Sequence, residues 1–415
     1  LQVAGDATLT GTAASDVVNV AGGNLGLVSA GRLGAGAAVT VSAGRTLTLA
    51  GAETVSALTL AGTLAGMGQE LTATSYTLQA GASVGANLGG GTLTVTGNST
   101  LAGSSAAAVV NLNAGTLTLG SAERLANNAA VTMLGAATLT LNGDDTVASV
   151  ASSGTINGSG TLLAGTYMLT GGVYDADIGG GALTATGVNL LNGRSAASSL
   201  DVISGTLTLG AAGRFTAQPD VTVRNAATLR LGGDETFSSL DGAGALDLQS
   251  HTLTSLALSD TSFSGAISGT GSLVKLGPGV FSLAGNNSYT GSTQVNSGAL
   301  VVAGTLQSGA LQVHGGTLAL DGSHRLANGA AVTVASGAAM TLAGDDTVAS
   351  LALAGTLAGT GTLTAATYAL DGGTAQANLG AGALSSVGLS TLNGTAAAST
   401  VAVNAGSLPE EPPTT

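Results

Sequence analysis

Apolar and polar residues alternate with a period of two along most of the chain. Leucine or valine alternates with threonine in short runs such as residues 46–49, 92–95, 116–119 and 206–209. Successive side chains of a β-strand point to opposite faces, so this alternation predicts short strands with Leu and Val inside and Thr outside. Glycine, asparagine and aspartate interrupt the runs every few residues and predict turns. The chain shows no 3.6-residue periodicity of the kind that indicates a helix.

The short runs belong to a longer repeat of about 91 residues. Arg32, Arg124, Arg214 and Arg325 stand at corresponding places, 92, 90 and 111 residues apart. A fixed long period made of short strands is typical of a solenoid, because each repeat buries its apolar face only by stacking on the next one. We therefore predict an all-β fold, an elongated parallel β-helix with roughly four to five turns of about 20 residues in each block.

The repeat divides the predicted β-helix, residues 1–408, into blocks. The segments are residues 1–31 (a partial block), 32–122, 123–213, 214–323 and 324–408. The third block is longer by about twenty residues, which we interpret as one additional turn. Tyr76, Tyr167 and Tyr368 follow their block arginines by 44, 43 and 43 residues and so keep the register. Residues 409–415 contain three prolines and two glutamates, cannot continue a β-ladder, and predict a Pro-rich linker.

An acidic residue follows each block arginine after about one predicted turn. Partners at that distance lie above one another on adjacent turns, so we predict inter-turn ion pairs that set the register. The predicted pairs are Arg32–Glu53, Arg124–Asp144, Arg214–Asp234 and Arg325–Asp345. Exposed ion pairs contribute only about 0.2–1 kcal/mol each, so we expect the inward aliphatic ladders to supply most of the stability.

Composition narrows the class of protein. With 44% apolar and 7% charged residues, the chain is expected to fold, and the 2% aromatic content suits a stack of small β-turns. A net charge of −13 with one lysine, Lys275, argues against binding to nucleic acid or to anionic membranes. The absence of cysteine suits an exported chain, although drift in small repeats explains it equally well. No signal peptide or spanning apolar segment is recognisable, so we interpret the chain as an interior piece of a larger protein.

Candidate chemistry is sparse. Asp144, Asp145, Asp345 and Asp346 lie in Gly-Asp-Asp-Thr turns and are weak calcium candidates. Calcium-binding nonapeptides need tandem repetition, whereas this motif occurs once in a block, so we favour a turn and predict no metal and no cofactor.

Catalytic motifs are also missing. His251, His314 and His324 have no ligand-like spacing, and there is no Gly-x-Ser-x-Gly elbow. Carboxylate pairs such as Asp144 and Asp145 could serve glycoside hydrolysis, but they recur at the same turn of several blocks, which suits architecture better than one active site. We predict that the chain is not an enzyme.

Residues 265–304 carry a dense motif of glycines at fixed spacing with Leu, Lys, Asn and Tyr-Thr-Gly. This segment resembles the autotransporter-associated β-strand repeat found in passenger domains of Gram-negative autotransporters. The matching residues are Gly269, Gly271, Leu273, Lys275, Gly277, Gly279, Phe281, Leu283, Gly285, Asn287, Tyr289, Thr290, Gly291, Thr293, Val295, Gly298 and Leu300. The rest of the chain is similar in composition to such passengers and to filamentous-haemagglutinin-like exoproteins.

The resemblance implies a right-handed, three-sided β-helix that is secreted with the help of an outer-membrane translocator and displayed on a Gram-negative cell. We expect an adhesin passenger that contacts host cell surfaces or extracellular matrix, copies of itself, or both. A structural stalk that presents a distal domain is the alternative, and an ice-binding threonine face or a β-helix enzyme is a distant third. One-chain autotransporter and two-partner exoprotein both stay open as the parent protein.

Overall fold

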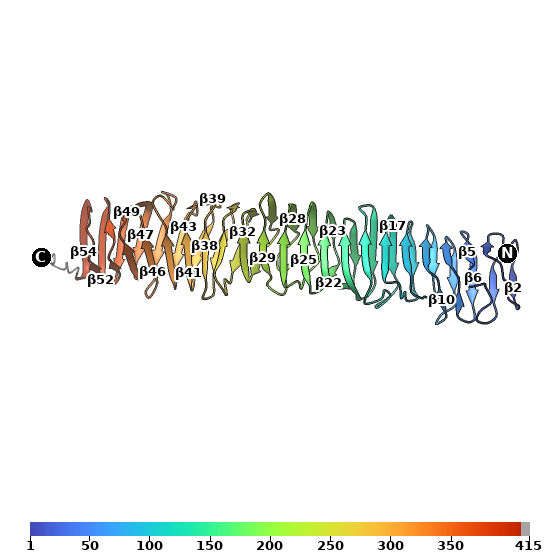
Figure 1. Cartoon of the computed structure of the whole chain (residues 1–415). Coiled ribbons are helices and arrows are strands. Elements are labelled where there is room, and N and C mark those ends of the chain that lie inside the picture. Colours follow the sequence, from blue (N-terminus) through green and yellow to red (C-terminus); the bar gives the residue numbers. More distant parts are fainter. Residues whose placement is uncertain (408–415) are drawn as a thin grey trace. The chain divides into compact units, whose positions relative to one another are not determined.

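The computed structural model describes residues 1–407 and divides into two compact units, Leu1–Ser198 and a second unit that begins at Ser199. Each unit is a succession of parallel β-strands (Figure 1). No helix occurs among the described residues, so none of them forms a helix that is long and apolar enough to cross a membrane. The predicted linker at 409–415 lies outside the described residues.

The first unit has three sheets, which we call 1A, 1B and 1C. Sheet 1A contains β1 (Gln2–Val3), β3 (Val17–Val20), β5 (Ala38–Val41), β8 (Ala57–Leu60), β11 (Ser75–Leu78), β14 (Thr92–Val95), β16 (Val109–Leu112), β18 (Ala130–Met133), β20 (Asp145–Ser152), β22 (Thr161–Leu169) and β25 (Ala182–Ala185). Sheet 1B contains β2 (Ala7–Leu9), β4 (Leu25–Leu27), β6 (Thr46–Leu49), β9 (Thr63–Ala65), β12 (Ala82–Val84), β15 (Ser99–Leu101), β17 (Gly115–Leu119), β19 (Ala137–Leu141), β21 (Thr155–Gly158), β23 (Gly172–Tyr174) and β26 (Val188–Leu191). Sheet 1C contains β7 (Glu53–Thr54), β10 (Glu70–Thr72) and β13 (Asn87–Leu88), and β24 (Asp177–Ile178) pairs with the start of β22.

The second unit has the corresponding sheets 2A, 2B and 2C. Sheet 2A contains β27 (Ser199–Val202), β29 (Asp220–Val223), β32 (Ser239–Gly242), β35 (Thr261–Phe263), β38 (Val280–Leu283), β41 (Ala299–Val302), β44 (Thr317–Leu320), β46 (Ala339–Leu342), β48 (Thr356–Gly359), β50 (Thr374–Ala375) and β53 (Thr391–Leu392). Sheet 2B contains β28 (Gly205–Leu209), β30 (Ala227–Arg230), β33 (Ala245–Asp247) and β36 (Ala266–Ser268), followed by the short pair β39 (Asn286–Asn287) and β42 (Thr305–Leu306). Sheet 2C contains β31 (Glu235–Phe237), β34 (Thr252–Ser255), β37 (Ser272–Lys275), β40 (Ser292–Val295), β43 (Ala310–Val313), β45 (Ala331–Val334), β47 (Asp346–Leu353), β49 (Thr362–Asp371), β51 (Asn378–Leu379), β52 (Ala383–Leu389) and β54 (Thr400–Ser407).

The strand register confirms the predicted parallel solenoid and fixes its pitch. Val39 pairs with Leu58, 19 residues later, and Leu58 pairs with Tyr76, 18 residues later. Strand β5 follows the first block arginine and β18 follows the second, and five pairing steps within sheet 1A connect them. A block of this length therefore makes five turns of about 18 residues, slightly tighter than the sequence predicts.

The alternating pattern produces the core as predicted. In β14, Leu93 and Val95 are fully buried, whereas Thr92 and Thr94 are partly exposed. The parallel register places Leu93 beside Tyr76 on one neighbouring turn and Val110 on the other, so large apolar side chains stack in continuous ladders. Burying apolar surface contributes about 25 cal/mol per Å², and these ladders repeat along every described turn of both units.

The extra length of the third block does not amount to one whole turn, which corrects the interpretation of the sequence. Strand β29 follows Arg214 and lies in sheet 2A, whereas the corresponding strand after Arg325, β45, lies in sheet 2C. From β29 the chain makes five turns to β44 in sheet 2A, then passes the 2B side at Leu326, which bridges to Leu306, before it enters β45. Turn length varies along the chain, so twenty residues do not define one turn.

Buried tyrosines in three blocks form hydrogen bonds with backbone groups three and five residues before them, at the corner between two sheets. The Tyr167 hydroxyl accepts a hydrogen bond from the Ala164 amide and donates one to the Leu162 carbonyl, both at 2.7 Å. Tyr76 and Tyr368 make the equivalent pair of bonds in their blocks. Burial raises the pKa of Tyr167 to about 12, so the hydroxyl stays protonated and keeps both roles at ordinary pH. The tyrosine register seen in the sequence thus reflects a corner with satisfied backbone groups.

We expect Tyr167→Phe to destabilise the first unit by roughly 1–3 kcal/mol, because it leaves the buried Ala164 amide without a partner, whereas the Leu162 carbonyl still accepts from the Gly179 amide. Tyr174→Phe is the matched control, since the Tyr174 hydroxyl is also buried but donates only to the Ser152 carbonyl, at 2.8 Å. Urea denaturation followed by circular dichroism measures both losses. An equal loss in the two variants would contradict the role of the Tyr167 corner.

Candidate functional site

A buried carboxylate marks the same corner of each block. Glu53, Asp145, Glu235 and Asp346 are at most 3% exposed. Asp145 accepts hydrogen bonds from the amides of Arg124, at 2.7 Å, and Leu125, at 3.3 Å, one turn earlier. The other three carboxylates accept the same two amides in their blocks.

The residue before each block arginine explains why these amides converge. Its φ is positive in all four blocks, at Gly31 (65°), Glu123 (53°), Gly213 (60°) and His324 (56°). A left-handed residue followed by ordinary backbone turns successive N–H groups toward one point and forms a concave anion site, called a nest. Glu123 and His324 adopt this conformation although they are not glycine, which costs free energy at these two residues.

The structure gives a different pairing from the predicted ion pairs. The buried carboxylate accepts a hydrogen bond from the backbone amide of the block arginine and not from its guanidinium group. In the last three blocks this carboxylate belongs to the second of the two adjacent acidic residues, Asp145, Glu235 or Asp346. The first acidic residue faces the next turn instead and accepts an amide hydrogen bond there. These bonds join Asp144 to Thr161, Asp234 to Thr252 and Asp345 to Thr362.

The guanidinium groups bind carbonyl oxygens near the same corners. Arg32 Nη1 donates to Thr10 at 3.1 Å, Arg124 Nη1 donates to Ala102 at 2.8 Å, and Arg325 Nη2 donates to Asp321 O at 3.0 Å. In the third block, Arg214 Nη2 donates to the Ala212 carbonyl at 3.1 Å. Each of the four arginine side chains therefore supplies a hydrogen-bond donor to a backbone carbonyl near its corner.

The described residues do contain ion pairs, but at other places. Arg224 pairs with Asp201 at 2.6 Å and Arg230 pairs with Asp247 at 3.1 Å. Both pairs join adjacent turns on the outer surface of the second unit, where each arginine is at least half exposed. Pairs as exposed as these add little stability.

Burial raises the pKa of Asp145 to about 6, and the two amide hydrogen bonds only partly counteract it. Burial shifts the pKa of Glu235 and Asp346 in the same direction. A carboxyl group with a folded pKa above its unfolded value binds a proton more tightly in the folded state, so its contribution to stability is complete at low pH. That contribution is lost as the pH rises through about 6 for Asp145.

We expect Asp145→Asn to cost more stability at pH 5 than at pH 8, by about 1–2 kcal/mol, because the wild-type carboxyl group favours folding mainly in its protonated form. Denaturation midpoints at both pH values measure this difference. Asp144→Asn is the control, since it removes the same charge from the exposed neighbour. A deficit that grows toward pH 8 would mean that the nest holds the carboxylate ionised.

The segment with the autotransporter motif contains a buried cation. Lys275 is completely buried, and its Nζ donates to the carbonyls of Leu276, Gly277 and Ser297 at 3.1, 2.9 and 3.2 Å. These three bonds use all three ammonium donors and join two adjacent turns. Burial lowers the pKa of Lys275.

Other motif residues also bind backbone across turns. Asn287 Oδ1 accepts from the Ile267 amide at 3.1 Å, and its Nδ2 donates to the carbonyls of Gly285 and Thr305, at 2.9 and 3.2 Å. The buried Tyr289 hydroxyl bonds Thr293 Oγ1 at 2.7 Å. A Cβ at Gly291 would lie only 2.1 Å from the carbonyl oxygen of Gly271, so glycine is required where these turns touch.

The apolar motif residues Leu273, Leu283 and Val295 are buried in the ladders. Among the remaining glycines of the motif, Gly269 has a positive φ of 107°, and a Cβ at Gly279 would lie 2.5 Å from the Ser259 carbonyl oxygen. The Thr290 amide donates to the Gly269 carbonyl at 3.1 Å. The polar and glycine positions of the motif therefore lie at corners where successive turns touch or are joined by hydrogen bonds.

We expect Lys275→Met to destabilise the second unit by roughly 2–4 kcal/mol, because methionine fills the space but removes the ammonium donor from the half-buried carbonyls of Leu276 and Ser297, while the Gly277 carbonyl keeps Ser297 Oγ. Val274→Met, on the outward side of the same strand, controls for the new side chain and should change stability by less than about 0.5 kcal/mol. Thermal denaturation compares the two. Equal melting temperatures would contradict a structural role for the lysine.

Apart from Asp371, an exposed residue at the end of β49, the outward surfaces of sheets 1A and 2C carry no charged residue over many successive turns. On sheet 1A the outward residues are Val17, Asn19, Ala38, Thr40, Ala57, Thr59, Ser75, Thr77, Thr92, Thr94, Val109, Asn111, Ala130, Thr132, Ser149, Ala151, Thr166, Met168, Ala182 and Thr184. On sheet 2C they are Thr252, Thr254, Ser272, Val274, Ser292, Gln294, Ala310, Gln312, Ala331, Thr333, Ser350, Ala352, Thr367, Ala369, Ala383, Ser385, Thr400 and Ala402. The sequence already holds this signal, because these positions alternate with the buried ones.

The described part of the chain has no cluster of potential metal ligands. In residues 1–407 no three His, Cys, Asp or Glu side chains gather as a metal site would require. Asp145 and Asp346, two of the weak calcium candidates, are occupied by backbone amides, and Asp144 and Asp345 bind amides of the next turn.

Comparison with known proteins supports one class. Residues 273–302 match the sequence model of the family described as Passenger-associated-transport-repeat. The chain is 35% identical over 182 residues, 42% of its length, to the adhesin BmaC autotransporter of Brucella suis biovar 1 (strain 1330). The resemblance to autotransporter passengers is therefore confirmed. The matched region spans about 5% of that adhesin, and no solved structure matches the chain.

Proposed function

We propose that the chain is part of an adhesin passenger at the surface of a Gram-negative bacterium, where it attaches to host surfaces or extracellular matrix and to copies of itself. The observation that carries this proposal is a pair of long outer faces on a chain with a net charge of −13: face 1A has no charge among its outward residues, and face 2C has one, Asp371. The passenger repeat and the resemblance to an autotransporter adhesin support surface localisation and secretion with an outer-membrane translocator.

Such faces suit contacts that are individually weak. Ten strands of sheet 1A at about 4.8 Å spacing, each about 13 Å wide, give roughly 600 Å². A standard stable interface buries about 800 Å² on each partner, so one pair of faces binds weakly. Many copies on one cell raise the total strength by avidity. The acids at the corners repel one another over about 10 Å at 0.1 M salt, and added salt weakens this repulsion.

The fold and the adhesin relative favour a role without catalysis. A stalk is the competing role, and the two differ in one property. An adhesin segment binds or clumps when it is displayed by itself, whereas a stalk does neither. The buried carboxylates of the four blocks, the corner tyrosines and Lys275 are accounted for by backbone hydrogen bonds, which suits either role.

We expect a non-adherent Gram-negative strain that displays all 415 residues to attach to matrix-coated or epithelial surfaces and to settle faster as salt rises. Thr77→Asp with Thr94→Asp, at the centre of sheet 1A, should reduce attachment several-fold, because two carboxylates must then be desolvated in the contact. Asn142→Asp with Ser159→Asp, at exposed corners, adds the same charge as the control. Neither attachment nor settling with the unchanged chain would favour the stalk.

A further inference from the structure

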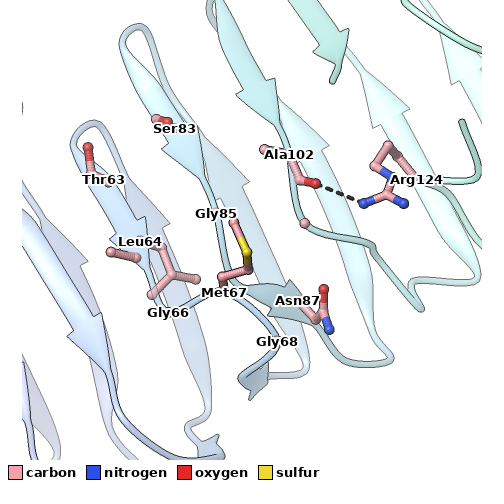
Figure 2. A pocket seen from close by; sticks show the side chains of 12 residues that line it. Thr63, Leu64, Gly66, Met67, Gly68, Ser83, Gly85, Asn87, Ala102 and Arg124 are labelled. Carbon is pink, nitrogen blue, oxygen red and sulfur yellow. Dashed lines mark hydrogen bonds between the residues drawn. The ribbon is translucent and has the colours of Figure 1, made fainter. Parts of the chain in front are cut away.

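A groove of about 460 Å³ crosses several turns of the first unit, at the corner where the chain leaves sheet 1B. Leu64 and Met67 line one end, Gly85 and Asn87 lie between, and Arg124 lines the other end (Figure 2). The lining is mostly apolar, and it contains no aromatic ring.

An exposed methionine forms the apolar end of this groove. Met67 is 93% exposed. The equivalent corner residue of the second block, Ser159, is exposed as well, so this corner position faces outward and the first block places an apolar side chain there. Methionine is flexible and polarizable, so an exposed methionine at a groove adapts readily to apolar ligand groups.

The opposite end presents hydrogen-bond donors. Arg124 Nε donates to the Ala122 carbonyl at 2.9 Å and Nη1 donates to Ala102 at 2.8 Å, so the guanidinium group is held in place while other N–H donors stay available. Asn87 Oδ1 accepts from the Ser104 amide at 3.0 Å, which leaves its NH₂ group as a further donor. The neighbouring Glu123 carboxylate accepts from Thr146 Oγ1, at 3.0 Å.

We propose that this groove binds an extended peptide segment of a partner protein that carries an apolar side chain and, about four residues away, a carboxylate. Three pairing steps separate the turn of Leu64 from that of Leu119, just before Arg124. These steps span about 14 Å, which about four extended residues cover at 3.3 Å each. The apolar group lies against Met67 and Ala65, since the Leu64 side chain is buried in the core, and the carboxylate pairs with Arg124. A sugar chain fits less well, since the groove offers no aromatic platform.

This binding gives the proposed adhesin a partner class, and it rests on that function only for its biological role. The test uses the purified 415-residue chain and no cells, so a failure here is distinct from a failure of attachment. The probe is a fluorescein-labelled peptide of serine, glycine and threonine with one leucine and, four positions on, one glutamate. A second peptide with glutamine in place of the glutamate measures the contribution of the charge by fluorescence anisotropy.

We expect the glutamate peptide to bind about tenfold more tightly than the glutamine peptide, and Arg124→Gln to abolish that difference. Arg124 also binds corner carbonyls, so a second variant guards against misfolding. A Cβ at Gly85 would lie 3.5 Å from its nearest neighbour, Leu64 O, so Gly85→Leu fills the groove without a clash. Gly34→Leu is the matched control, because its Cβ would also lie 3.5 Å from a carbonyl oxygen, that of Ala13.

Loss of binding in Gly85→Leu and full binding in Gly34→Leu support the proposal. No binding of the glutamate peptide to the unchanged chain overturns it, and so does unchanged binding to Gly85→Leu. A polyuronate oligosaccharide is the competing ligand. Binding of that oligosaccharide, blocked by Gly85→Leu, without binding of the peptide would overturn the assignment to a peptide.

Discussion

In-register parallel stacking is the constraint on which the rest of this structure depends. Each residue lies about 4.8 Å from its equivalents on the neighbouring turns, so every side-chain choice is repeated as a ladder. Two like charges at that distance repel by about 1 kcal/mol even in water, whereas aliphatic and hydroxyl groups stack without such a cost. The same rule therefore yields the Leu and Val core and outer faces that carry few charges. A surface suited to adhesion arises here from a requirement of folding.

The corners are the costly part of such a fold, because the ladders are interrupted there and backbone groups lose their partners. The chain fills these positions with a small set of polar side chains. Tyr167 binds an amide and a carbonyl of its own corner, Asp145 binds two amides one turn earlier, and Lys275 binds three carbonyls. The buried carboxylates, the corner tyrosines and Lys275 thus serve as hydrogen-bond partners of the backbone.

The alternation of Thr with Leu was enough to predict the strands, their inward residues and the solenoid, because period two has one structural meaning over so many repeats. The spacing of arginine and acid correctly indicated adjacency on neighbouring turns. The spacing could not show that Asp145 accepts a hydrogen bond from the Arg124 amide. That contact depends on the positive φ of Glu123, and a glutamate in the sequence does not indicate a positive φ as a glycine would. The groove at Met67 was equally hidden, because the sequence does not show which corner side chains of successive turns lie side by side.

The fractional turn of the third block has a consequence for the outer faces of the second unit. Strands β27, β29 and β32 of sheet 2A carry Asp201, Asp220 and Asp241 on their outward side. Strands β35, β38, β41 and β44 of the same sheet carry uncharged outward residues, so the charged stretch of sheet 2A ends before the fourth block. The fractional turn places β45 and its successors in sheet 2C, in series with the uncharged strands β34 to β43. Sheet 2C thereby continues through β54 with one acid, Asp371, among its described outward side chains, and this length, more than any single residue, is what a multivalent contact needs.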